Sequence, residues 1–223
     1  MVRFIDHEYG RLETYRRLLG HTGLKVSSFV LGTWQVTEAQ WISERKNVAR
    51  FISEQSPYSI LNRSIEFDLL AATAKYGIGV LVWSPLSGGL LTGKYRFGEA
   101  YSADSRAATF AGSLKSVVDP NREENRPKFE AIAKLQTLAD EAGLTLPHLA
   151  MAFTQSHPAI TSAIIGARTI EQLRETLKGS ITRLSNDVLD AIDTIVPPGV
   201  TLDAMEKGWT PDWLESDKRR IKG

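Results

Sequence analysis

The sequence predicts an α/β protein with a parallel sheet flanked by helices. Short apolar runs alternate with amphipathic segments, and each run ends at a polar or glycine-containing step. The clearest run, residues 78–83, is nearly continuously apolar, which is typical of a parallel strand buried on both faces. Ligands bind at the carboxyl ends of strands in such folds, which directs attention to Thr33, Gln55, Ser84 and Gly166.

Composition bounds the possible functions. A chain of 223 residues with 42% hydrophobic and 24% charged residues is typical of one soluble globular unit. Lys and Arg number 27 against 26 acidic residues, so composition favours no nucleic-acid partner. The absence of Cys excludes disulfides, thiolate metal sites and Cys nucleophiles. No apolar run reaches 18 residues and no secretory leader is visible, so we expect a cytoplasmic protein without a membrane partner.

The N-terminal quarter contains a polar extension and then the start of the fold. Residues 1–14 are polar without a clear period and are predicted to lie outside a single domain of residues 15–223. Two short strands around a glycine-containing turn, typical of a hairpin, occupy residues 15–27. A short apolar strand follows at 29–33, and apolar spacing predicts an amphipathic helix at 35–47.

The middle of the chain alternates strand, helix and strand. Residues 48–53 are strand-like, and residues 63–76 are predicted to form a helix that ends at Gly77. The apolar strand at 78–83 comes next. Residues 88–124 then lack a strong period, and an unstructured stretch of this length inside a domain is usually functional or mobile.

The C-terminal part returns to regular elements. Helices are predicted at about 126–142 and 146–156, followed by an apolar strand at 160–165. Two further helices are predicted at about 169–178 and 185–196, the second ended by a Pro-Pro pair.

Two turns at strand ends are candidate phosphate sites. The small residues of 84–89 follow a buried strand and offer backbone N–H groups to a pyrophosphate, although a glycine-rich turn is equally compatible with a turn alone. Residues 166–169 precede a helix, where backbone donors, the helix dipole and Arg168 favour an anion. The alternative is a helix capped by Thr169 with a solvated Arg168, and locally this reading is slightly favoured.

The histidines and the densest titratable cluster predict no catalytic triad and no metal site. Asp6 to Tyr9 are consecutive residues of the polar extension rather than one face of an element. His21 lies in the hairpin turn, and neither His148 nor His157 has a visible carboxylate or Ser partner.

Several ordered motifs resemble the aldo-keto reductases, NADPH-dependent enzymes with a (β/α)8 barrel. Residues 15–27 look like the family's N-terminal hairpin and Leu31-Gly-Thr33 like its first barrel strand. Three later motifs look like its sixth, seventh and eighth strand ends: Ser53-Glu-Gln55, Gly79-Val-Leu-Val-Trp-Ser-Pro-Leu86 with Gly88 to Tyr95, and Ile164-Ile-Gly-Ala-Arg168. The resemblance implies a partial TIM barrel with strands in the order 6-7-8-1.

The resemblance also implies an NADP site. Gln55 would bind the nicotinamide carboxamide and Trp83 would stack on the ring. The pyrophosphate would be lined by Ser84, Leu86 and Gly88, with Lys94 nearby. The adenosine and its 2′-phosphate would be held by Gly166, Ala167, Arg168, Gln172 and Glu175. Thr176 replaces the family's usual Asn beside them.

The same resemblance implies the loss of the catalytic residues. Between Thr33 and Val48 there is room for one helix only, so the segments for strands two to five, which carry the family's catalytic Asp, Tyr, Lys and His, are missing. We therefore predict no catalytic residue, with Tyr58 and Tyr95 the plausible replacement acids near strand ends.

Three hypotheses follow: a reductase acting on a small carbonyl substrate with a replacement acid, a non-catalytic NADP-binding or regulatory protein, and a truncated product without function. Open barrel edges predict a homodimer.

Overall fold

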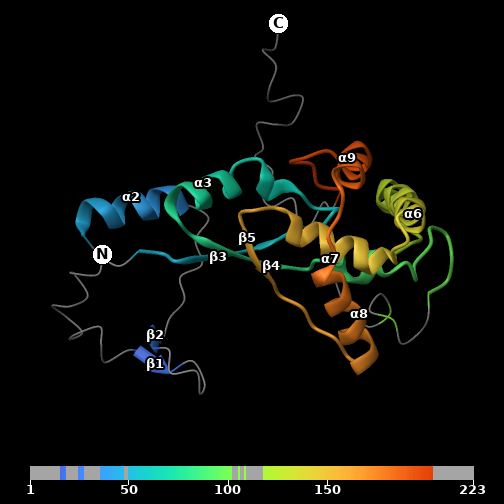
Figure 1. Cartoon of the computed structure of the whole chain (residues 1–223), viewed down its shortest axis with the longest axis horizontal. Coiled ribbons are helices and arrows are strands. Elements are labelled where there is room, and N and C mark those ends of the chain that lie inside the picture. Colours follow the sequence, from blue (N-terminus) through green and yellow to red (C-terminus); the bar gives the residue numbers. More distant parts are fainter. Residues whose placement is uncertain are drawn as a thin grey trace, which may run out of the picture.

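The computed structural model describes residues 16–18, 25–27, 36–47, 50–101, 105, 108 and 118–202, with backbone alone at 16–18, 25–27 and 36–38. Three strands form a parallel sheet in the order β3-β4-β5. They are β3 (Ser53–Pro57), β4 (Gly79–Trp83) and β5 (Ile160–Ala163). Helices flank this sheet, which confirms the predicted α/β class and its parallel order (Figure 1).

The predicted hairpin is also present. Strands β1 (Arg16–Leu18) and β2 (Lys25–Ser27) pair antiparallel in a separate two-stranded sheet. The predicted extension 1–14, the strand at 29–33 and the cluster at residues 6–9 all lie outside the described residues.

The helices follow the predicted order with shifted ends. They are α2 (Val36–Lys46), α3 (Leu69–Tyr76), α6 (Arg126–Glu141), α7 (Leu146–Ser156), α8 (Ile170–Ile181) and α9 (Asn186–Ile195). None of these described helices is both long and apolar enough to cross a bilayer.

Two predicted boundaries in the middle of the chain are wrong. The strand predicted at 48–53 begins at Ser53, because the pairing of Ser53 with Gly79 sets the register with β4. The helix predicted at 63–76 is a 3₁₀ turn at Ser64–Glu66 followed by α3, since Asp68 has an extended φ of −145° that interrupts the helix. Gly77, with φ of 65°, ends α3 as predicted.

The core lies between one face of the sheet and the helices. Val80 and Val82 of β4 point into it and are completely buried. Helix α7 contributes Leu149 and Phe153, and α6 contributes Leu135. Helix α7 contacts β5, while α6 contacts both α7 and α9. This packing holds in place the carboxyl ends of β4 and β5, which lead into the candidate site.

The opposite face of the sheet is open. We use "open face" for the side of Gln55, Leu81 and Ser162, which are paired by register. Trp83 and Ile164, two residues further along their segments, continue this side. The indole of Trp83 is 40% exposed and Ile164 is 42% exposed. The prediction that 78–83 is buried on both faces is therefore wrong, because Leu81 is only half-buried and Trp83 is exposed.

Candidate functional site

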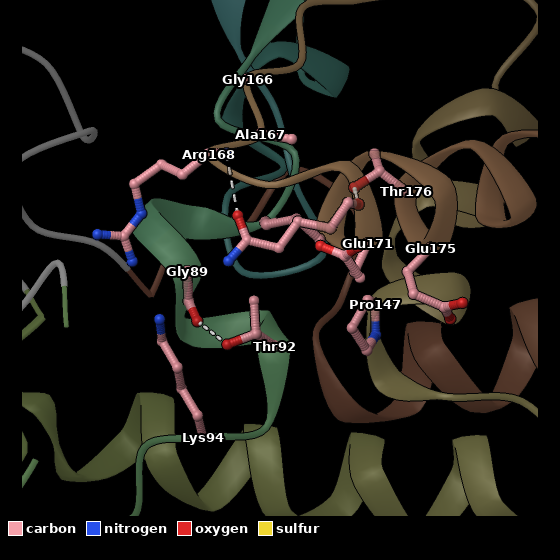
Figure 2. Close-up of a pocket in the computed structure, with 12 residues that line it drawn as sticks. Gly89, Thr92, Lys94, Pro147, Gly166, Ala167, Arg168, Glu171, Glu175 and Thr176 are labelled. Carbon is pink, nitrogen blue, oxygen red and sulfur yellow. Dashed lines mark hydrogen bonds between the residues drawn. The ribbon is translucent and has the colours of Figure 1, made fainter. Parts of the chain in front are cut away.

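A pocket of about 390 Å³ opens where the loop after β4 meets the turn after β5, which is large enough for part of a cofactor (Figure 2). The loop contributes its segment from residue 86 to 94, α7 contributes Pro147, and the rest comes from the turn at 166–168 and the first turns of α8. Seven predicted cofactor residues line it: Leu86, Lys94, Gly166, Ala167, Arg168, Gln172 and Glu175.

Charges of both signs surround this pocket. Lys94 extends from the loop below, and Arg168 extends from the turn above toward the same side, as Figure 2 shows. Glu171 and Glu175 lie on α8 at the other side. The cations therefore mark the part of the pocket suited to phosphate, and the carboxylates mark a part suited to hydrogen-bond donors.

The start of α8 is held by a local hydrogen-bond pair. The Thr169 hydroxyl oxygen accepts the amide of Gln172 at 3.2 Å, and the Gln172 side-chain oxygen accepts the amide of Arg168 at 3.0 Å. The predicted Thr169 cap is therefore confirmed. It fixes the turn that carries Arg168 and directs the positive end of the helix dipole toward the pocket.

Glu175 is held by two partners, Lys178 and His148. Its carboxylate lies 2.6 Å from the Lys178 amine and 3.0 Å from Nε2 of His148 on α7. These contacts, that of Lys178 first, hold the pKa of Glu175 below its usual range. His148 thus has a carboxylate partner that the sequence did not reveal, because the two residues belong to different helices. The signal available was only that His148 lies in the first turn of a predicted helix and Glu175 in the helix that follows the next strand.

The glycine-rich loop has an unusual backbone and few available amides. Ser84 and Ser87 have φ values of 60° and 47°, and Gly88 and Gly89 have 64° and 100°. The amide of Ser87 donates to the Ser84 carbonyl, that of Gly88 to the Ser84 hydroxyl and that of Gly89 to the Leu86 carbonyl. The expectation of free amides at these three positions is therefore wrong, since internal turns use them.

The remaining predicted cofactor residues lie away from the pocket lining. Gln55 and Trp83 are on the open face of neighbouring strands, where both are exposed. Ser84 and Gly88 are joined by a hydrogen bond inside the loop, from the Gly88 amide to the Ser84 hydroxyl oxygen. Sequence reasoning had not assigned four other lining residues to the site: Gly89, Thr92, Pro147 and Glu171. The residues predicted to bind the adenosine end thus meet in one pocket, whereas those predicted to bind the nicotinamide lie on the sheet.

Neither predicted replacement acid reaches this site. Tyr58 is 1% exposed, and its hydroxyl donates to Glu66 at 2.6 Å. Burial and the nearby Glu66 carboxylate raise the pKa of Tyr58 far above its usual value. Tyr95 is 3% exposed, with the Lys94 amine 5.1 Å from its ring centre. Both phenols belong to the core, so their proposed role as acids is wrong. Among the described residues no group of three metal-ligating side chains exists.

The chain belongs to the aldo/keto reductase family, whose model matches residues 22–197. The three parallel strands and their helices are thus a part of that family's (β/α)8 barrel.

The curated relatives include an oxidoreductase and channel subunits. The chain is 33% identical to the uncharacterized oxidoreductase YrpG of Bacillus subtilis, over 74% of this chain and 47% of that protein. It is 36% identical to a probable voltage-gated potassium channel subunit beta of Arabidopsis thaliana, over 73% of this chain and 49% of that protein. It is 31% identical to protein Tas of Escherichia coli, over 69% and 42%. The chain spans about half the length of these relatives.

Proposed function

We propose that this chain binds NADP(H) through the adenosine-phosphate end and does not reduce carbonyls by itself. The observation that carries the proposal is the convergence of Lys94 and Arg168 on one pocket beside the start of α8. Two cations and a helix N-terminus form an environment that favours a phosphate group. The chemistry of this donor set fits the phosphorylated end of the cofactor.

The two sides of the pocket suit different parts of that ligand. Arg168 would pair with the 2′-phosphate, because its planar guanidinium can donate two parallel hydrogen bonds. Lys94 would approach the pyrophosphate. The side chains of Gln172 and Glu175 would face the adenine. Because Lys178 and His148 hold the Glu175 carboxylate in place, adenine would meet a preorganised acceptor.

The nicotinamide end would lie at the carboxyl end of β4, beside Trp83. Gln55 and Trp83 occupy adjacent strands, and Trp83 leads directly into the loop that lines the pocket. When bound, NADPH supplies a hydride. This chain would hold the ring by stacking on Trp83 and by hydrogen bonding to Gln55, with part of the family's cradle missing.

Reduction of a carbonyl also needs a proton donor at the developing oxyanion. A positioned general acid contributes about 10²–10⁴-fold, and one oxyanion donor is worth roughly 10²–10³-fold. The segment that carries the family's catalytic residues is missing from the sequence, and both Tyr58 and Tyr95 are buried. Ground-state binding of cofactor does not replace these contributions, because it does not lower the chemical barrier.

A regulatory role is the second candidate. The observation in its favour is the similarity to a probable potassium channel subunit beta, which is named for an assembly rather than for a reaction. A protein that binds NADP without turnover would act through its bound state, and its partner would be another protein.

The test is a calorimetric titration with NADP and with NAD. We expect NADP to bind more tightly, and Arg168→Ala to weaken NADP by roughly 10- to 100-fold while leaving NAD nearly unchanged. Arg174→Ala is the matched control, since Arg174 is exposed on the same helix but does not line the pocket. Unchanged NADP affinity in Arg168→Ala would remove the assigned site.

Activity is followed in parallel through NADPH absorbance with a panel of aldehydes and ketones. We expect no turnover above background in the wild-type chain. Robust turnover that disappears in Tyr58→Phe or Tyr95→Phe would restore the reductase hypothesis and refute the claim that both phenols serve the core alone.

A further inference from the structure

The open face leaves apolar side chains exposed on a sheet whose other side is densely packed. Trp83 and Ile164 are exposed there and Leu81, two residues before Trp83, is half-buried, whereas Val80 and Val82 on the other side are fully buried. A sheet is stable in water when its apolar face packs against another layer. The open face therefore needs a cover that the described part of this chain does not supply.

Helix α8 presents a second apolar surface. Ile170, Leu177 and Ile181 are separated by seven and four residues and so lie on one side of the helix. Their exposed fractions are 58%, 49% and 81%. The other side of α8 packs tightly on α7, because a Cβ at Gly179 would lie 2.7 Å from Cβ of Met151. We call Ile170, Leu177 and Ile181 the α8 stripe.

Helix α2 presents a third apolar surface. Trp41 and Ile42 are about half exposed, while Gln40 faces inward and donates to the Phe51 carbonyl at 2.7 Å. Helix α2 contacts α3, and α8 contacts α7. Helix α2 precedes β3 and α8 follows β5, the two edge strands of the described sheet, and Figure 1 shows α2 beyond α3 and α8 beside α7. We call Trp41 and Ile42 the α2 patch.

The geometry of a parallel barrel specifies what covers these surfaces. In a closed ring of parallel strands each outer helix packs against the next, so the first and last helices of a partial ring each lack one neighbour. A twofold rotation about the barrel axis keeps all strands parallel and brings the last helix of one copy beside the first helix of the other. The part of this chain that matches its relatives spans about half of their length, so two copies supply two such halves.

We propose that the chain forms a twofold homodimer in which the α8 stripe of each copy packs on the α2 patch of the other and the two open faces enclose a shared core. The occupant of each surface is thus a second copy of this chain. The proposal does not depend on cofactor binding. It predicts two equivalent helix contacts, which agrees with the isologous interface of a twofold dimer.

The arrangement uses three surfaces of each copy to form one stable interface. Such interfaces bury about 800 Å² on each partner and concentrate their affinity in a few aromatic and aliphatic anchors. Trp41 is the aromatic anchor of the helix contacts, and it is about half exposed in the single chain.

The first experiment measures mass by sedimentation velocity over a wide range of protein concentration. The chain of 24.7 kDa is expected to sediment as a dimer. Leu177→Glu/Ile181→Glu and Trp41→Glu/Ile42→Glu each place charges in both contacts, so each is expected to weaken dimerisation by roughly tenfold or more per substitution. Phe67→Glu is the control: Phe67 is 85% exposed but belongs to neither helix, so this variant stays dimeric.

Mixing the two double variants tests the pairing itself. In the mixed dimer one α8 stripe and one α2 patch are intact and meet, so heterodimers are expected to form although neither variant dimerises alone. A dimer built from α8 against α8 would leave the α2 variant dimeric, which contradicts the proposal. A monomeric wild-type chain, or a mixture without heterodimers, would also overturn it.

Cross-linking covers the case in which a charged variant fails to fold. Because the chain has no Cys, Ile42→Cys/Leu177→Cys introduces a unique pair. A short bismaleimide is expected to join two chains of this variant at low protein concentration. Phe67→Cys/Leu177→Cys should give no such product, and equal yields from the two variants would refute the assigned contact.

Discussion

Replacing Arg63 with Met tests the charged cluster that ties the loop after β3 to the C-terminal helix. Arg63 is 5% exposed, and its Nη1 lies 2.6 Å from both the Asp193 carboxylate and the Val196 carbonyl. Its Nε donates to Glu66 at 2.9 Å. Arg63→Met keeps much of the apolar volume and removes all of these contacts.

The size of the effect follows from the burial of the partners. The Glu66 side chain is 9% exposed, so without Arg63 it is a buried carboxylate that retains the Tyr58 hydroxyl as a donor. Removing one member of a buried pair costs about 3–5 kcal/mol. Asp193 is 42% exposed and regains water, so its own contribution is at most about 1 kcal/mol. We therefore expect a loss of about 3–5 kcal/mol in the free energy of unfolding.

The assay is urea unfolding at pH 7 and one fixed protein concentration, because dimerisation would shift apparent stability. The double variant Arg63→Met/Glu66→Gln should recover most of the loss, since no buried charge remains. Arg122→Met is the control, because Arg122 and Glu124 form an exposed pair at 3.4 Å. A loss below about 1 kcal/mol in Arg63→Met, or an equal loss in the double variant, would refute the reasoning.

Two further predictions concern α7 and its neighbours. Burial lowers the pKa of His157, whose neutral Nδ1 accepts the Ala159 amide at 3.2 Å, so the folded state resists protonation. The free energy of unfolding should therefore fall as the pH drops below the ordinary His pKa, and a pH series of melts should be flatter in His157→Asn. Gly179→Ala places a methyl group 2.7 Å from Met151 Cβ and should cost about 1–3 kcal/mol by urea unfolding, whereas Gly166→Ala, with open space around it, should cost little stability.

Local signals in the sequence predicted the local structure well. Thr169 and Gly77 mark helix ends through chemistry that acts within four residues, and both ends are confirmed. The turn at 166–168 and the loop at 86–94 were identified as neighbours because parallel strands place their carboxyl ends at one edge. The pocket was therefore predictable from strand order, even though Pro147 and Glu171 of its lining were not assigned.

Features that depend on distant partners were not predictable in this way. The Ser84 hydroxyl accepts the amide of Gly88, so a loop whose composition suggests free donors closes on itself. Tyr58 follows a strand end, where a catalytic acid would lie, but it packs against Phe153 and donates to Glu66. The sequence can place a residue at the end of a strand. Whether its side chain is exposed there depends on what the rest of the chain packs against it.

Strand β4 is the opposite case: the sequence predicts burial, and the structure shows an exposed residue. Its apolar run satisfies the pattern of a strand covered on both sides, and Val80 and Val82 are covered, but Trp83 is not. An apolar pattern predicts that both faces of a strand are buried, but it does not say what covers them. The second layer can come from the same chain or from another copy. The exposed apolar residues of β4 are consistent with a partner layer supplied by a second chain, and sedimentation of the α2 and α8 variants decides whether that layer forms.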